Sequence, residues 1–389
     1  MLHPYGLSEP ADLDLALKAT SLAREVLARH AVDVDASGRY PSESIAALGQ
    51  AGLLGLCVAK DSGGVGAGTR GFAAVVEELS QSCASTAMVF VMHVSAQQAI
   101  AASGTLATRG ELLRKIAAGQ HLTTLALSEK GSRSQFWAPV SKLAESNGGF
   151  TTTAQKSWVT AANHADSYVC SGQRPGAASP MESTLYLVRR GDGGVRVDGA
   201  WKGLGLRGND SAPVFIEGAR VAASDLVTKG GEGAQAMLQV ILPWFSIGSA
   251  AMANGLCRAA TAATAAHMSQ AGFEHTGGKL RDLPNLRARL AEMAVRTEQA
   301  RALLGRTLGE LEHPSAETPL FVLMARLASI EAAVAVTDLA MKTCGGAAFS
   351  GHLPIERLFR DARAGWVMAP TVDHLNDFVG KALTGLPLF

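Results

Sequence analysis

The sequence predicts an α+β protein, mostly α, in which a block of strands separates two blocks of helices. Three observations predict this order. Apolar residues recur at helical spacing in the first third of the chain, short segments rich in Val, Thr, Tyr and Phe fill its middle, and long Ala-rich helical segments make up the rest. We therefore expect an N-terminal helical domain (1–120), a middle antiparallel β-domain (121–230) and a C-terminal four-helix bundle (231–389).

The N-terminal domain is expected to hold five helical segments, three of which run up to a glycine. Gly38, Gly52 and Gly119 stand at the C-terminal position where glycine is favoured, because the chain there often turns left-handed. The expected helices cover residues 11–38, 41–52, 70–81, 84–102 and 111–119.

The middle domain is expected to consist of short strands separated by Gly, Pro, Asn or Asp. Several of them alternate apolar and polar residues, which is typical of antiparallel sheets with one buried face. Ser-Asn-Gly-Gly at 146–149 predicts a tight hairpin. The expected strands cover residues 121–129, 150–160, 167–173, 183–190, 194–199 and 212–221.

The C-terminal domain carries long helical segments that are rich in small residues, as is typical of an up-and-down bundle. Pro243 predicts a kink or a helix start in the first of them, because proline cannot sit inside a regular helix. The segments cover residues 234–268, 286–312, 320–346, 355–369 and 374–383.

Composition limits the function. A net charge of +1, with Lys and Arg scattered, argues against partners that are nucleic acids or membrane surfaces. The five cysteines are far apart and lack metal-ligand spacing, so we expect free thiols, no metal site and a reducing compartment. The N-terminus lacks the pattern of a signal peptide, and we expect a cytoplasmic protein. The cysteines are Cys57, Cys83, Cys170, Cys257 and Cys344.

Two stretches together indicate a binding site. Leu125–Ser134, LALSEKGSRS, is a short apolar run that ends in small, hydroxylated and glycine residues, whose backbone can approach a ligand closely. Lys156–Thr160, KSWVT, places a flat aromatic side chain beside a hydroxyl at the end of a β-rich segment. The pair indicates a site for a planar cofactor with a polar edge.

Motifs along essentially the whole chain resemble the acyl-CoA dehydrogenase family. SEKGSRS at 128–134 is similar to the family's TEPGAGS, and KSWVT is similar to its K-x-W-I-T. The segments 203–227 and 343–363 resemble the family's strand pair after MGLRGS and its GGxGF and VERxxRDAR motifs. The resemblance implies FAD as the cofactor and, as the reaction, α,β-oxidation of an acyl thioester by hydride transfer to flavin N5.

The resemblance also implies which residues contact FAD. In the family, the loop at Ser128 hydrogen-bonds the pyrimidine edge of the flavin, the residue at Trp158 lies against the ring, and that at Thr160 reaches toward N5. The paired glycines let the backbone approach a neighbouring subunit's FAD, since they have no Cβ. The implied cofactor-binding residues are Leu127, Ser128, Ser134, Trp158, Thr160, Gly345, Gly346 and Thr371.

The implied substrate is an acyl-CoA or a carrier-bound acyl thioester, and Ser134 is implied to approach its CoA part. Lys130 and Arg133 add positive charge beside it, which either binds an acidic substrate group or only solvates the loop. An electron-transferring flavoprotein is a further implied partner. The glycine pair implies a homo-oligomer, either a dimer or a tetramer.

The sequence departs from the family at the catalytic base. The usual Glu, eight residues after the Asp of the RDAR motif, is replaced by Ala369, and the alternative position on the first bundle helix maps to Ile241. Three weak substitutes remain. His374 and Asp373 follow on the next turn, where a pair of residues on the helix surface is the favoured interpretation. His93 lies on a helix that lines the family's pocket, where a buried, hydrogen-bonded histidine is the competing interpretation.

Three functions therefore stay open. The first is an acyl thioester dehydrogenase with an unusual base or a substrate that needs none. The second is a flavin-dependent monooxygenase or oxidase on the same fold, because activation of oxygen by reduced flavin requires no α-proton base. The third is a catalytically silent subunit that pairs with an active homologue. The fold alone does not choose between them.

Overall fold

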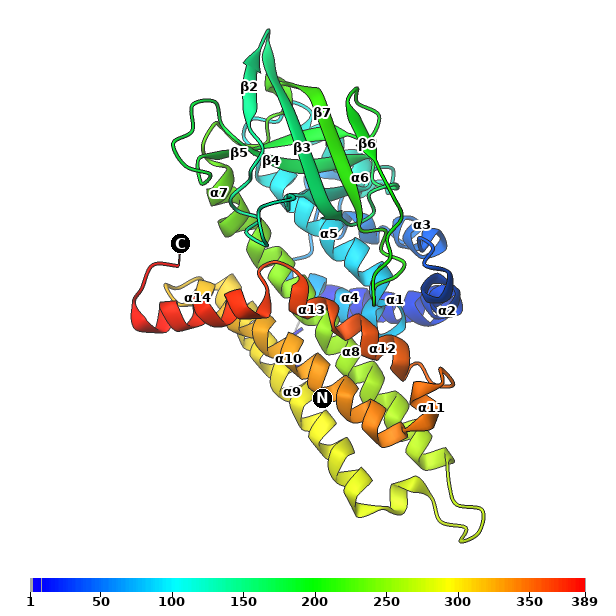
Figure 1. Ribbon diagram of the computed structural model, residues 1–389. Helices are drawn as coiled ribbons and strands as arrows, with labels where there is room; N and C mark the ends of the chain where they lie inside the picture. The colour runs from blue at the N-terminus through cyan, green and yellow to red at the C-terminus, as the bar shows by residue number, and fades with distance from the viewer. Residues whose placement is uncertain (1–2, 8, 389) are drawn as a thin grey trace.

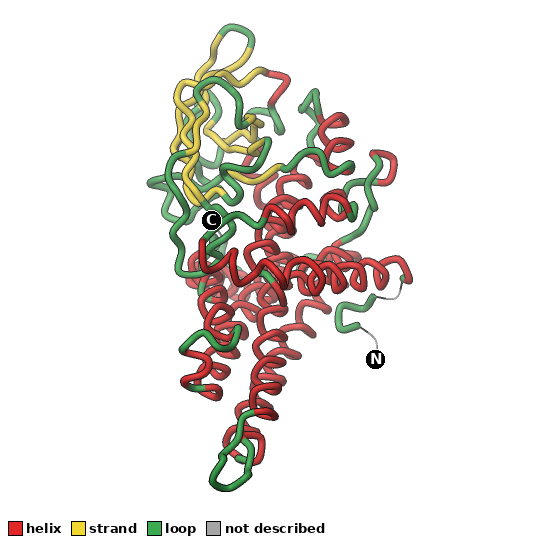
Figure 2. The backbone as a smooth tube through the Cα atoms, turned by 90° about the vertical axis from the view of Figure 1, so that its right-hand side faces the viewer, coloured by secondary structure: helices red, strands yellow, loops and turns green. Residues whose placement is uncertain are grey.

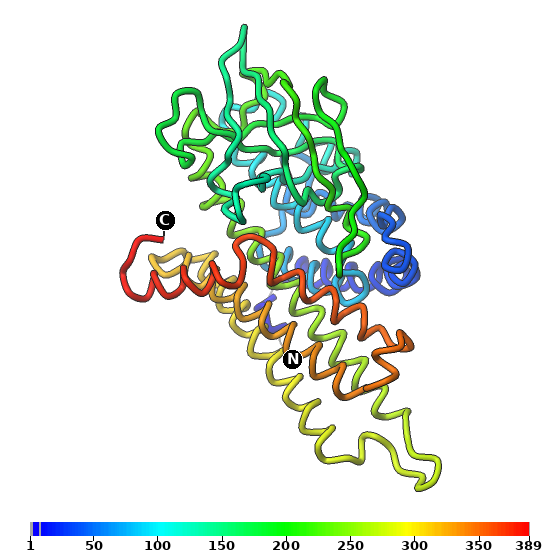
Figure 3. Tube along the Cα trace, in the orientation of Figure 1, coloured from blue at the N-terminus to red at the C-terminus, as the bar shows by residue number. Residues whose placement is uncertain are grey.

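The computed structural model describes residues 3–7 and 9–388, and it confirms the expected order of helices, strands and helices (Figures 1 and 2). The β-domain forms one end of the molecule, and the longest helices of the C-terminal domain run away from it toward the other end. The N-terminal helices pack beside both, at the middle of the molecule (Figure 3).

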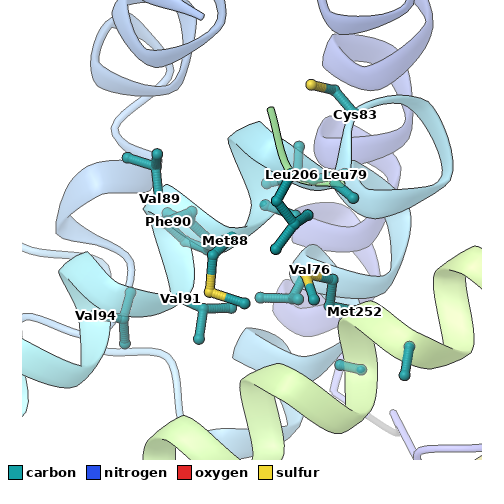
Figure 4. Packing of buried hydrophobic residues seen from close by; sticks show 14 of the residues in the cluster. Val76, Leu79, Cys83, Met88, Val89, Phe90, Val91, Val94, Leu206 and Met252 are labelled. Carbon is teal, nitrogen blue, oxygen red and sulfur yellow. The ribbon is translucent and has the colours of Figure 1, made fainter. Parts of the chain in front are cut away.

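Two helices, α4 (Thr69–Ser82) and α5 (Ala84–Ala102), form the centre of the N-terminal domain, and both pack on α8 (Leu242–Gln270) of the C-terminal domain. An added Cβ at Gly255 of α8 would lie 2.4 Å from the carbonyl oxygen of Glu77 in α4, so only glycine lets these two backbones approach. Figure 4 shows the core between them, with Val76, Leu79, Met88, Phe90, Leu206 and Met252. The N-terminal helices are α1 (Pro10–Leu22), α2 (Ala28–Ser37), α3 (Ser42–Gln50), α4 (Thr69–Ser82), α5 (Ala84–Ala102) and α6 (Arg109–Ala117).

The β-domain holds two sheets, with strand orders β2-β3-β7-β6 and β1-β4-β5. The hairpin predicted at 146–149 is confirmed, since Ser146 pairs with Gly149 across the turn between β2 and β3. β1 runs parallel to β4, a pairing that the sequence pattern did not predict. The strands are β1 (Thr123–Ala126), β2 (Leu143–Ser146), β3 (Gly149–Val159), β4 (Ser167–Gln173), β5 (Ser183–Arg189), β6 (Val195–Val197) and β7 (Ala212–Ala222).

Three long helices, α8, α9 and α10, form the body of the C-terminal domain, α12 packs on α8 and α10, and α14 packs on α10. Pro243 lies directly after a π-turn at Met237–Ile241, within one continuous helical segment from Gly233 to Gln270, so the helix does not start at Pro243 and its interruption takes the form of the π-turn. The remaining elements are α7 (Gly233–Ala236), α9 (Pro284–Glu312), α10 (Thr318–Cys344), α11 (Gly346–Phe349), α12 (Ile355–Ala362), α13 (Ala364–Val367) and α14 (Val372–Thr384).

Two helical segments, Gly233–Gln270 and Thr318–Cys344, are long and apolar enough to cross a membrane by length and composition alone. Of their apolar windows, 61% and 56% of the residues are buried inside the protein. Both segments pack against other helices of the bundle, so burial in a protein core explains their apolar character.

The loop between β6 and β7 is fixed to α12, which ties the β-domain to the bundle. The carboxylate of Asp361 accepts a hydrogen bond of 2.7 Å from the backbone N–H of Leu206. An added Cβ at Gly205 would lie 2.3 Å from the carbonyl oxygen of Arg360, so the loop lies directly on the helix backbone. Burial raises the pKa of Asp361 to about 6, against the opposing hydrogen bond from Leu206.

This raised pKa predicts that the free energy of unfolding depends on pH. Between about pH 4, the ordinary pKa of an unfolded Asp, and pH 6, native Asp361 holds more proton than the unfolded chain does, so the free energy of unfolding falls as pH rises. Asp361→Asn cannot ionise, and we expect its stability to fall less than the wild type's across this interval. Urea unfolding from pH 4 to 7 measures the difference, with Asp377→Asn on the exposed face of α14 as the control. Parallel stability curves for wild type and Asp361→Asn would contradict the expectation.

Candidate cofactor and substrate site

The two stretches that the sequence singled out lie against each other. The backbone N–H of Lys130 donates to the carbonyl of Gln155 at 3.1 Å, and the N–H of Ser157 donates to the carbonyl of Ser128 at 2.8 Å. Glu129 and Lys156 face each other in this short antiparallel bridge. The loop after β1 is thereby attached to the end of β3.

A buried ion pair fixes this attachment. The ammonium of Lys156 donates to the Glu129 carboxylate at 2.5 Å and to the carbonyl of Ser171 at 2.6 Å, and both charged side chains are almost completely buried. The backbone N–H groups of Val140 and Ser141 donate to the same carboxylate, each at 2.7 Å. Burial opposes ionisation of Glu129, but the Lys156 charge and these hydrogen bonds outweigh it and hold the pKa of Glu129 below its usual range.

Left-handed backbone concentrates around the same segments. Residues other than glycine rarely adopt positive φ, at a cost of about 1–3 kcal/mol each, and such residues cluster at ligand sites. Within the described chain they fall only in the segments 133–134, 158–161 and 206–210. These residues are Arg133 (φ 49°), Ser134 (φ 68°), Trp158 (φ 58°), Ala161 (φ 55°), Leu206 (φ 50°) and Asp210 (φ 50°).

The indole of Trp158 is exposed to solvent. The residue lies within a register shift between Lys156 and Val159, and such bulges change the direction of side chains. Its side chain is 68% exposed, and its ring meets that of Trp201 edge-on, with 5.7 Å between ring centroids. The indole N–H of Trp201 donates to the carbonyl of Leu206 at 2.9 Å, which holds the supporting ring in place. An exposed aromatic face in a fixed orientation is a stacking surface for a planar ligand.

Polar groups lie beside this aromatic face. Thr160 is buried, and its hydroxyl lies 3.2 Å from the hydroxyl of Ser211. The N–H of Ala161 donates to the carbonyl of Asn209 at 2.9 Å, which joins the end of β3 to the 206–210 segment. The side-chain oxygen of Asn209 is buried and has no hydrogen-bond partner among the residues that the structure describes. An aromatic face with hydroxyl and unsatisfied amide groups nearby fits a planar ring with a polar edge, such as a flavin.

The other predicted residues of the 127–134 loop differ in exposure. Leu127 is buried and Ser128 half-buried at its start, Ser134 is half-buried at its end, and Lys130 and Arg133 are exposed. The two positive charges therefore face solvent beside the aromatic platform.

The predicted glycine pair lies elsewhere in the chain. Gly345 and Gly346 are exposed at the junction of α10 and α11, and an added Cβ at either would meet no heavy atom within 4 Å. Figure 1 shows α11 against the bundle helices, well away from the β-domain. Within one chain this pair does not join the platform at Trp158.

Both expected base positions lie in apolar surroundings. Ile241 ends the π-turn before α8, and Ala369 lies between α13 and α14. The two belong to one hydrophobic cluster, with Leu242 and Leu375 among its buried members. Neither position offers a group that accepts a proton.

His93 is engaged by backbone on both sides of its ring. Its Nδ1 lies 3.1 Å from the N–H of Thr123 and its Nε2 lies 3.1 Å from the carbonyl of Leu54. This arrangement suits a neutral ring that donates from Nε2 and accepts at Nδ1. Burial lowers the pKa of His93 to about 4. The ring links α5 to β1 and to the turn at Leu53–Gly55.

His374 and Asp373 stand in the first turn of α14. The Thr371 hydroxyl caps this helix: it accepts from the N–H of His374, and it lies 3.0 Å from Nδ1 of the same histidine. The His374 ring also meets the Trp137 ring edge-on and the Phe378 ring face-on. Asp373 is exposed. Thr371 therefore orients the imidazole, while Trp137 brings the loop after β1 against α14.

Arg326 in α10 was not among the site residues predicted from the sequence. Its side chain is completely buried, its Nη2 donates to the carbonyl of Met368 at 3.0 Å, and its Nε and Nη1 have no partner among the described residues. One signal could have found it, because Arg326 is the only charged residue in the long apolar run from Thr318 to Ile330. No group of three or more potential metal ligands occurs in residues 3–7 and 9–388.

Three family models match nearly the whole chain. They describe the N-terminal domain of acyl-CoA dehydrogenases (residues 10–120), the middle domain (124–219) and the C-terminal domain (231–383). The chain belongs to the acyl-CoA dehydrogenase family. FAD, the predicted cofactor, is the cofactor of this family, and solved structures of the fold include an FAD-dependent dehydrogenase and an FAD complex of PigA.

Relatives within the family are distant. The short-chain specific acyl-CoA dehydrogenase of Bos taurus mitochondria is 27% identical over 86% of this chain and 80% of its own length. The cyclohex-1-ene-1-carbonyl-CoA dehydrogenase of Syntrophus aciditrophicus is 25% identical over 97% of this chain and 90% of its own. The butyryl-CoA dehydrogenase structure of Megasphaera elsdenii superposes with a TM-score of 0.92 at 22% identity, over 97% of this chain and 98% of that one.

The buried ion pair yields a stability prediction. Glu129→Gln leaves the Lys156 ammonium buried without a counter-charge, and we expect the free energy of unfolding to fall by about 3–5 kcal/mol. The matched control is Glu145→Gln on the exposed part of β2, which we expect to change stability by less than about 0.5 kcal/mol. Chemical denaturation of the two variants measures both. Equal, small effects would show that the ion pair does not hold the loop.

Proposed function

We propose that this chain is an FAD-dependent oxidoreductase that oxidises the Cα–Cβ bond of an acyl-CoA or carrier-bound acyl thioester. The observation that carries the proposal is the attachment of the 128–134 loop to β3, which holds the exposed indole of Trp158 and the left-handed loop in one fixed arrangement. Membership of the acyl-CoA dehydrogenase family supports it.

The residues of the platform bind and orient the cofactor in this proposal. Bound FAD supplies the hydride acceptor, flavin N5. Trp158, whose indole is exposed, would stack on the flavin ring, and Leu127, Ser128 and Thr160 would hold its polar groups. Ser134 and the exposed charges beside it contact the CoA part of the substrate.

The acyl side of the proposed site excludes water through the apolar cluster around Ile241 and Ala369. Because neither position can take the α-proton, the proton must leave to another group or the substrate must not require a base. His374, held by the Thr371 hydroxyl, is the remaining candidate acceptor of this segment.

The apolar base positions favour a second candidate, a flavin-dependent monooxygenase or oxidase on the same fold. Reaction of reduced flavin with oxygen needs a dry pocket but no carboxylate at Cα. Ala369 and Ile241 are compatible with this chemistry as they stand.

We also propose that the chain forms a homodimer or a dimer of dimers. Phe349 ends α11, the short helix that begins at Gly346 of the glycine pair, and is 81% exposed, and Val367 in α13 is 73% exposed. Exposed apolar side chains of this size are typical of surfaces that a second subunit covers.

Absorbance spectroscopy tests the proposed function. The purified protein is loaded with FAD and mixed without oxygen with acyl-CoAs of increasing chain length. Bleaching of the flavin band near 450 nm by one of them would support the dehydrogenase. A flavin that no acyl-CoA bleaches, but that consumes oxygen once it is reduced, would support the second candidate. A protein that binds no FAD would contradict both candidate functions, and the catalytically silent subunit would be the remaining alternative.

A carboxylate at the first base position should restore ordinary family chemistry. We expect Ala369→Glu to increase the rate of flavin reduction by a fitting methyl-ended acyl-CoA about 100-fold or more, because a positioned general base contributes at least this much. Stopped-flow absorbance measures the rate. Asn376→Glu, at an exposed polar position on α14, is the control that should show no gain. Absence of any gain across all chain lengths would contradict the dehydrogenase proposal.

A further inference from the structure

Arg326 is a buried cation without a counter-charge. Its side chain is completely buried on α10, and no carboxylate of the described residues forms an ion pair with it. Its Nη2 donates to the carbonyl of Met368, whereas Nε and Nη1 are buried with no acceptor in the described chain. Burial alone lowers the pKa of Arg326 to about 9, which is a large displacement for a guanidinium.

The surroundings do not compensate this charge. The aromatic ring of Phe245 in α8 lies beneath the guanidinium, 4.7 Å from its centre to the ring centroid. A cation–π contact of this kind stabilises a cation only in part. Buried charges in folded proteins are normally paired, because an uncompensated one costs several kcal/mol. A buried arginine with two free N–H directions is therefore expected to have an anionic partner that the chain itself does not supply.

Arg326 lies beside the acyl side of the proposed site. The carbonyl that accepts from it belongs to Met368, the neighbour of Ala369, and both of these residues are only half-buried. Phe245 follows Ile241 by about one turn of helix on α8. Arg326 thus lies between the two segments that carry the expected base positions, where other members of the family would have a carboxylate.

We propose that Arg326 binds a carboxylate on the acyl group of the substrate, so that this protein takes the CoA or carrier thioester of a dicarboxylic acid. The inference rests on the proposed function and adds the substrate class. Free guanidinium N–H groups match a carboxylate, which accepts two parallel hydrogen bonds. Replacing the usual Glu by Ala369 removes a negative charge that would neutralise Arg326 and repel such a substrate.

Calorimetric titration with matched acyl-CoA pairs tests the inference. The pairs are malonyl with propionyl, succinyl with butyryl, and glutaryl with pentanoyl, so that each pair differs only by a carboxylate in place of a methyl group. For at least one length we expect the wild type to bind the dicarboxylic member about 10- to 100-fold more tightly. Arg326→Met should lose this preference, and Arg326→Lys should retain part of it. Arg306→Met, on the exposed side of α9, should behave as the wild type.

Thermal unfolding without ligand separates a binding role from a structural one. A methionine fills similar space without a buried charge, so we expect Arg326→Met to raise the melting temperature by about 2 °C or more. A lower melting temperature for Arg326→Met would assign Arg326 to the fold instead. If Arg326→Met does not fold, the wild type and Arg326→Lys still decide the question, because equal or tighter binding of the methyl-ended member at every length overturns the inference.

The outcomes distinguish this inference from the proposed function. Calorimetry reports binding whether or not the protein carries flavin. A flavin that is bleached by methyl-ended acyl-CoAs, with no preference for dicarboxylic ones, would leave the oxidoreductase standing and overturn the role of Arg326. A protein that takes no FAD but binds a dicarboxylic thioester through Arg326 would overturn the proposed function alone.

Discussion

The buried ion pair between Glu129 and Lys156 is the interaction on which the arrangement of the site depends. It joins a loop from one sheet to a strand of the other, and it does so without solvent to screen the charges. The carboxylate also accepts from the backbone where the loop returns at Val140 and Ser141, so both ends of the loop are anchored to one side chain. The left-handed residues at 133–134 and the outward indole of Trp158 persist because their neighbours are fixed in this way.

The two halves of the proposed site differ in how closely their residues match the family. On the cofactor side, polar contacts hold an aromatic platform, and these residues match the motifs of the family. On the proposed acyl side, both base positions are apolar, and the guanidinium of Arg326 donates to the carbonyl of Met368 beside one of them. An unpaired buried guanidinium lowers the stability of the fold, since replacement by an apolar residue would stabilise it. The buried charge of Arg326 therefore favours a protein that binds a different substrate over a protein without a function.

The sequence predicted those features that local pattern determines. The hairpin at 146–149, the interruption of the helix beside Pro243 and the fold order all follow from turn residues, a proline or periodicity, and each is present in the structure. The parallel pairing of β1 with β4 could not be predicted, because it depends on which strands meet in space. The pairing of Glu129 with Lys156 likewise joins residues that are distant in sequence. Arg326 was visible as a lone charge in an apolar run, but its lack of a counter-ion is a fact of packing that no single segment reveals.

A crystal structure of the FAD-loaded protein with a dicarboxylic acyl-CoA tests the central claim most directly, that a flavin platform faces a pocket with a cation in place of a base. The account predicts the flavin ring against the indole of Trp158 and the substrate carboxylate on the guanidinium of Arg326. It also predicts that Ala369 and Ile241 line the acyl chain. A flavin bound elsewhere, or an Arg326 neutralised by a carboxylate of a second subunit with the substrate pointing away, would contradict it.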